Sequence, residues 1–133
     1  MTGSDTRHVF VYGTLRRGEV NDITRLQPAP RYLGIASIPG EMYHLGDYPG
    51  VVLGGSGRVQ GEVFAIVAEL EHQLDAIETI EPAHCSEYVR RQVELRVGDR
   101  TLQCLVYEVR PHCVRGRPRI VDGDWVRARR GHV

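Results

Sequence analysis

The sequence predicts an α+β fold in which a curled sheet or a small barrel carries one main helix. Short apolar runs typical of strands follow one another along the 133 residues, without strict β/α alternation. Only one convincing stretch has helical spacing, and residues 100–109 are apolar on both faces, as in a barrel wall or a covered sheet. A chain of this length supports one domain with one core.

The first element is a nearly continuous apolar run over residues 8–12, which predicts a strand buried on both faces. Gly13 and Gly18 lie on either side of a polar turn, so a tight loop should follow the strand. Residues 1–7 are polar and are expected to be disordered. Because they lack the apolar core of a signal peptide, and because no run reaches a membrane span, we expect a cytoplasmic protein without membrane contact.

The middle of the chain reads as short strands separated by proline and glycine turns. The expected segments are strands 32–38 and 41–45 with a Pro39-Gly40 turn between them, a loop at 46–50, a short strand at 51–53, a glycine turn at 54–57 and a strand at 59–67.

The helix follows, because Leu70, Leu74 and Ile77 recur at helical spacing. Pro82 limits its length, so it should end near Thr79.

The last third predicts a hairpin and a packed C-terminal end. Strands at 88–97 and 100–109 flank Gly98-Asp99, which is a two-residue hairpin signal. Trp125 is expected to pack on the domain body. We expect one domain over residues 8–126 and a basic tail at 127–133.

Composition excludes several chemistries. All 17 basic residues are Arg, so a Schiff-base or phosphate-loop Lys is impossible. Residues 1–109 carry 10 Arg and 15 acids (net −5), whereas residues 110–133 carry 7 Arg and 2 acids (net +5). We expect a solvated or self-docking tail and no nucleic-acid binding, since aromatics are not interleaved with its arginines. Three cysteines without a Cys-x-x-Cys pair predict free thiols and no zinc site.

Glu78 is the most informative polar residue. It follows Leu74 by four residues and therefore sits at the edge of the inward face, in the last helical turn. Burial and the helix dipole would both raise the pKa of its carboxyl, which suits a group that takes up and returns a proton. The alternative is a structural Glu paired with Arg90 or Arg91. Glu81 is a weaker candidate for the same role.

The loop at residues 12–15 could supply the complementary half of a site. A glycine turn after a buried strand exposes consecutive N–H groups, which can bind a carboxylate or a developing oxyanion. It can equally be only a turn.

Taken together, these motifs resemble the γ-glutamylcyclotransferase-like superfamily, on the γ-glutamylamine cyclotransferase branch. The resemblance covers nearly the whole chain in the expected order. It rests on the strand and Tyr-Gly-Thr-Leu loop at 9–16, Gly-x-Met-Tyr and Tyr-Pro-Gly-Val-Val within 40–52, Val-x-Gly-Glu-Val-Phe at 59–64, Leu-Asp-x-x-Glu at 74–78, Tyr-x-Arg at 88–90 and Gly-Asp-Trp at 123–125.

The resemblance implies a mixed barrel-like sheet with a pocket between the first strand's loop and the helix. It implies an enzyme that forms 5-oxoproline from a γ-glutamyl amine, peptide or carrier-linked group, with Glu78 as the general acid/base and no metal or cofactor. The implied substrate-binding residues are Tyr12, Gly13, Thr14, Leu15, Pro49, Gly50, Val51, Tyr88 and Tyr107.

Thr79 departs from the family pattern, which often has Gly after the catalytic Glu, so the substrate's identity stays open. The alternative function is a non-catalytic module of the same fold that binds a small metabolite. The expected partner is a small γ-glutamyl molecule, and the protein is expected to be a monomer or homodimer.

Overall fold

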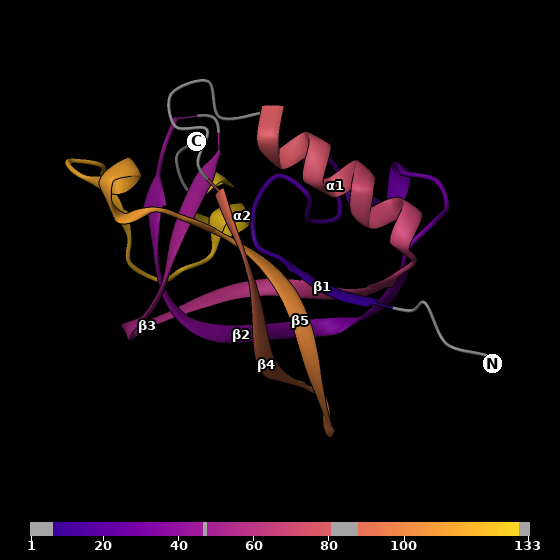
Figure 1. Cartoon of the computed structure of the whole chain (residues 1–133). Coiled ribbons are helices and arrows are strands. Elements are labelled where there is room, and N and C mark those ends of the chain that lie inside the picture. Colours follow the sequence, from indigo (N-terminus) through magenta and orange to yellow (C-terminus); the bar gives the residue numbers. More distant parts are fainter. Residues whose placement is uncertain (1–6, 47, 81–87, 131–133) are drawn as a thin grey trace.

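The computed structural model describes residues 7–46, 48–80 and 88–130, and side chains for 7–46, 48–76 and 88–128 (Figure 1). The strands are β1 (Arg7–Val11), β2 (Arg31–His44), β3 (Pro49–Ile66), β4 (Tyr88–Val97), β5 (Arg100–Val109) and β6 (Arg119–Ile120). The helices are α1 (Ala68–Ile80) and α2 (Trp125–Arg130), with 3-10 turns η1 (Ile23–Arg25) and η2 (Pro111–Val114).

The six strands form one mixed sheet in the order β4-β5-β1-β3-β2-β6. β1 pairs in parallel with β5, at Val9 opposite Leu105, and antiparallel with β3. The sheet curls so strongly that Val97 of β4 reaches Gly34 of β2, where a Cβ would lie 2.8 Å from its Cγ1. No pairing among the described strands joins the two edges, so the predicted curled α+β sheet is confirmed as an open one.

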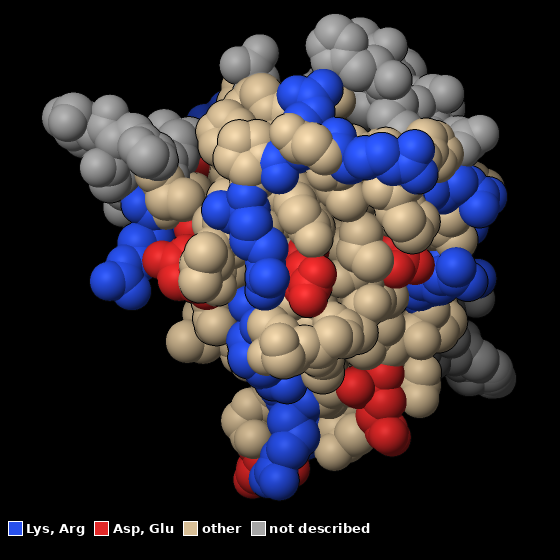
Figure 2. Space-filling model, turned by 90° about the vertical axis from the view of Figure 1, so that its left-hand side faces the viewer, with Lys and Arg blue, Asp and Glu red and all other residues tan. Residues whose placement is uncertain are grey.

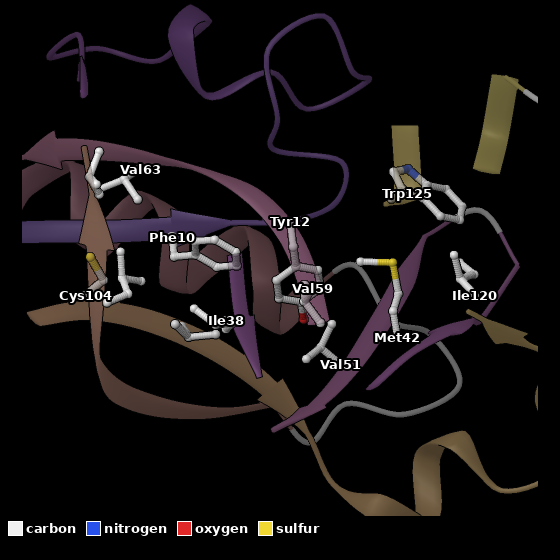
Figure 3. Close-up of a cluster of buried hydrophobic side chains, with 13 residues drawn as sticks. Phe10, Tyr12, Ile38, Met42, Val51, Val59, Val63, Cys104, Ile120 and Trp125 are labelled. Atoms are coloured by element: carbon white, nitrogen blue, oxygen red, sulfur yellow. The ribbon is translucent and has the colours of Figure 1, made fainter. Parts of the chain in front are cut away.

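Both faces of the central strands are buried, as the sequence predicted for residues 100–109. Cys104 and Val106 face a cluster that also holds Phe10 and Trp125 (Figure 3), whereas Leu105 and Tyr107 face a second cluster. The second cluster includes Leu70 and Leu74 of α1, which lies across this face of the sheet (Figure 1). The helix is therefore held by its apolar side against β1 and its neighbours.

The helix and the β4–β5 hairpin agree closely with the prediction. α1 ends one residue after Thr79, and β4 and β5 have the predicted bounds. Val97 pairs with Arg100 across the two-residue turn, where Gly98 adopts φ +62°. Glycine suits this turn because it enters the left-handed region without steric cost.

Two predicted turns are wrong. Residues 39–40 lie within the continuous strand β2, and residues 54–57 lie within β3. The register changes from Pro39 opposite Arg58 to Gly40 opposite Leu53, so residues 54–57 are an insertion that β3 accommodates as an irregularity. Local proline and glycine signals cannot distinguish such an insertion from a chain reversal.

The C-terminal end packs on the domain, as predicted for Trp125, whose side chain is 3% exposed. The expected boundary between 126 and 127 falls inside α2, and β1 already begins at Arg7.

Arg119 pairs with Glu41 of β2 at 3.8 Å, and Figure 2 shows acidic side chains among the arginines on one face. None of the helices in the described ranges is long and apolar enough for a membrane span.

Cys104 is a free, buried thiol, and burial raises the pKa of that thiol to about 12. Cys113 is disulfide-bonded, so the expectation of a free thiol was wrong there. A count of cysteines does not reveal which thiols a fold brings together. Cys85 lies outside the described residues.

Candidate functional site

A pocket that is partly open to solvent lies where β1 ends. The chain leaves the centre of the sheet at this point, and neighbouring elements complete the walls. The lining residues are Phe10, Val11, Tyr12, Gly13, Thr14, Leu15, Tyr48, Pro49, Tyr88 and Tyr107.

Topology explains why these segments meet. β1 lies between β5 and β3, so β5 supplies Tyr107 and the start of β3 supplies Pro49. Pro49 packs directly over Gly13, where a Cβ would lie 2.7 Å from its Cγ. Glycine is therefore required at 13 for the β2–β3 hairpin to approach the loop.

Two tyrosines connect the pocket wall to α1. The Tyr12 hydroxyl donates a hydrogen bond to the Tyr107 carbonyl at 2.6 Å. The Tyr107 hydroxyl donates to Oδ1 of Asp75 at 2.5 Å. Asp75 precedes Glu78 by three residues in α1, so this bond joins the pocket to the helical segment that carries Glu78.

The pocket loop uses its carbonyls, whereas three of its N–H groups have no partner among the residues that the structure describes. The Gly13, Thr14 and Leu15 carbonyls accept bonds from the N–H groups of Arg16 (3.0 Å), Asn21 (2.9 Å) and Ile23 (3.0 Å). Within the described residues, no hydrogen bond engages the N–H groups of residues 13–15. Three consecutive free donors in a pocket wall can bind an anion or a polarised carbonyl.

Glu78 lies in α1, one turn beyond Leu74, and its side chain is outside the described set. Both arginines that the structural alternative assigned to it have other carboxylate partners. Arg90 pairs with Glu71 and, at 3.3 Å, with Asp75, while Arg91 pairs with Glu108 at 2.9 Å. Glu81 lies outside the described residues.

The pocket brings together seven of the nine expected binding residues. Gly50 and Val51 are not in its wall: Val51 is fully buried in the core, and Gly50 packs against Leu45 and Val109. The sequence analysis missed Phe10, Val11 and Tyr48 as lining residues. Tyr48 could have been found, because it precedes Pro49 in the same Tyr-Pro-Gly loop, whereas the two β1 residues read only as core.

Comparison with known proteins identifies the family. The statistical model of the family described as "Gamma-glutamyl cyclotransferase, AIG2-like" matches residues 9–127. The chain belongs to this gamma-glutamyl cyclotransferase family. The match spans the pocket loop, α1 and the C-terminal segment, so the resemblance seen in the sequence is confirmed.

Relatives of this gamma-glutamyl cyclotransferase family cover nearly the whole chain. The family protein YtfP of Escherichia coli K12 is 36% identical over 119 residues, which are 89% of this chain and 95% of that protein. A putative gamma-glutamylcyclotransferase of Vibrio cholerae is 38% identical, over 88% and 93% of the two chains. The crystal structure of an AIG2-like protein from Mus musculus has a TM-score of 0.71 at 24% identity, over 87% and 86%, which shows the shared fold.

Membership supports a cyclotransferase-like enzyme at the level of the family. In the described ranges, no group of three or more His, Cys, Asp or Glu side chains could hold a metal ion.

Proposed function

We propose that the protein releases 5-oxoproline from a γ-glutamyl amine, peptide or carrier-linked γ-glutamyl group. The observation that carries this proposal is the pocket wall of three free N–H groups at 13–15, joined through Tyr107 and Asp75 to the helix that bears Glu78. Such a site offers anion-binding donors in the pocket wall, and the proposal assigns the proton-carrying carboxylate to Glu78.

In the proposed reaction, Glu78 takes a proton from the substrate's α-ammonium group. The free amine attacks the γ-carbonyl carbon of the same molecule, so a C–N bond forms and closes a five-membered lactam. The bond from that carbon to the original amine nitrogen then breaks. Glu78 gives this first proton to the leaving nitrogen and takes the second proton that the ring nitrogen must lose. The released amine then takes up the second proton and departs as an ammonium ion, so the Glu78 side chain ends as it began.

The free N–H groups of Gly13, Thr14 and Leu15 suit the negative charge of a carboxylate or of the oxyanion that develops in this reaction. They would hold the glutamyl end of the substrate by hydrogen bonds without a cationic side chain. Because the attack is intramolecular, orientation supplies much of the acceleration, up to about 7–11 kcal/mol in favourable cases.

The first prediction is that Glu78→Gln abolishes 5-oxoproline formation, because an amide cannot carry the proton. The purified protein is incubated with a panel of γ-glutamyl amides, peptides and carrier conjugates, and 5-oxoproline is measured by mass. Glu69→Gln is the matched control, since Glu69 is an exposed acid on the same helix and should turn over like the wild type.

Equal turnover by the Glu78→Gln variant would show that this mechanism is wrong. If the wild type forms no 5-oxoproline from any member of the panel, the enzyme proposal fails. Saturable binding of a panel member without turnover would then support the non-catalytic binding module.

A further inference from the structure

Two segments that the proposed reaction does not use meet at the pocket loop. One is Gly61-Glu62 on β3, and the other is Gly123-Asp124, directly before α2. Both bind Arg16, which follows the pocket residue Leu15. Since they lie 46 and 108 residues from Arg16, the fold alone brings them there.

Glu62 binds the loop through both of its carboxylate oxygens. Oε2 accepts a hydrogen bond from Nε of Arg16 at 3.2 Å, and Oε1 accepts one from the N–H of Arg17 at 3.0 Å. Glu62 is only 5% exposed. A buried carboxylate is costly without its partners, so Glu62 strongly favours the loop conformation that supplies them.

Asp124 binds Arg16 from the other side. Its Oδ1 lies 3.0 Å from Nη1 of Arg16 and also accepts the N–H of Arg127 in the first turn of α2. The Arg16 side chain is 12% exposed, between one carboxylate from the middle of the chain and one from near its C-terminus.

The C-terminal segment is fixed on β3, so Asp124 has a defined place. The N–H of Gln60 donates to the Gly123 carbonyl at 2.8 Å. A Cβ at Gly123 would come within 1.8 Å of the Arg58 carbonyl oxygen, so only glycine allows this approach. Gly123 therefore allows the C-terminal segment to lie directly on β3, next to Arg16.

The main chain connects Arg16 to the pocket, so bonds that hold Arg16 also restrict the pocket loop. The N–H of Arg16 closes a turn onto the Gly13 carbonyl at 3.0 Å, and this turn contains the free donors at 14 and 15. We propose that Glu62 and Asp124 are positioning residues that hold Arg16 and so keep the pocket loop preorganised for the glutamyl end of the substrate. The kinetic part of this inference rests on the proposed function.

Hydrogen–deuterium exchange tests the positioning without any substrate. In Glu62→Gln and in Asp124→Asn, exchange of the Arg16 N–H, which is bonded to the Gly13 carbonyl, should accelerate about tenfold, because each variant loses one charge-assisted partner of Arg16. Exchange in the β4–β5 hairpin should stay as in the wild type. The control is Glu41→Gln, which removes an acid paired with Arg119 rather than with Arg16.

Steady-state kinetics on a substrate that the wild type turns over test the consequence. We expect KM to rise about tenfold in both variants. The pH profile of kcat, which reports Glu78, should not change. A variant that is merely less folded would instead show a lower apparent kcat at an unchanged KM, and the Glu41→Gln control should match the wild type.

Unchanged exchange of the Arg16 N–H in both variants overturns the inference, and so does faster exchange with an unchanged KM in an active enzyme. If the wild type forms no 5-oxoproline, the proposed function fails and the exchange result alone decides whether Glu62 and Asp124 hold the loop. If Glu62→Gln does not fold, Asp124→Asn decides, because its side chain is 26% exposed and tolerates the change better.

Discussion

At the scale of single residues, the Tyr107 hydroxyl has an unusual position, because it connects the pocket wall to α1. Tyr107→Phe removes its bond to Asp75 and keeps the ring in place. We expect the free energy of unfolding to fall by about 1 kcal/mol, because the Asp75 carboxylate is partly exposed and regains water. Urea unfolding measures this change.

Tyr43→Phe is the control for Tyr107. The Tyr43 hydroxyl donates to Glu41, two residues away on the same strand, so its bond joins no separate elements. We expect a smaller loss of stability. A loss at Tyr43 equal to that at Tyr107 would contradict the special role of the Tyr107 bond.

Asp22 makes the stability of the fold depend on pH. Burial alone would raise the pKa of its carboxyl, but hydrogen bonds from Thr24 and from the Gly18 N–H outweigh burial and hold the pKa below its ordinary value. A carboxyl with a depressed folded-state pKa stabilises the fold above its unfolded-state pKa. That contribution is lost as the pH falls through the folded-state pKa.

We therefore expect Asp22→Asn to be less stable than the wild type near neutral pH but to lose less stability in acid. Urea unfolding at about pH 6 and about pH 3 gives the two differences. An equal loss of stability on acidification in both proteins would show that Asp22 does not contribute to it.

At the scale of elements, β1 and β3 are in such close contact that Gly61 has no room for a side chain. A Cβ at 61 would lie 2.4 Å from the Val11 carbonyl oxygen and 2.5 Å from Cζ of Phe10. Gly61→Ala should lower the free energy of unfolding by about 1–3 kcal/mol, as overpacking does. Gly40→Ala, whose nearest contact would be 3.2 Å, should cost less, and urea unfolding of both variants measures the order.

The elements also show what the sequence could and could not reveal. α1 and the β4–β5 hairpin follow from local signals, because apolar spacing and the Gly98 turn suffice to define them. β2 and β3 do not, since Pro39 and the glycines at 54–57 have the composition of turns. Only the pairing of β2 with β3 shows that Pro39 lies inside a strand and that residues 54–57 are an insertion in β3.

In the pocket too, some lining residues follow from local sequence signals and others depend on contacts between distant segments. Tyr12 to Leu15 could be predicted, because the glycine turn follows a buried strand directly. The wall from Tyr48 depends on the β2–β3 hairpin, and the bond from Tyr107 to Asp75 depends on how the helix packs against β5. Contacts between distant segments leave no periodic signal in one sequence.

At the scale of the whole molecule, Trp125 closes the core from the C-terminal side, next to Met42 and Ile120 (Figure 3). Trp125→Ala should cost about 3–5 kcal/mol of unfolding free energy, because it leaves a large cavity. Trp125→Phe should cost less than about 2 kcal/mol. The indole N–H has no hydrogen-bond partner within the described residues, so the phenyl ring loses volume but no bond.

Circular dichroism in urea measures both variants, since Trp125 is the only tryptophan and fluorescence would be lost with it. Equal destabilisation by Ala and Phe would indicate that the indole nitrogen matters more than the volume of the ring.

The central place of β1 has a consequence for the order in which the protein is made. β1 is synthesised before its partners, which are residues 62–66 of β3 and Leu105 of β5. During synthesis, this apolar strand therefore stays unpaired on one side until β5 has been made. The pocket, which lies at the end of β1, therefore assembles among the last parts of the molecule, when Tyr107 and then Asp124 arrive.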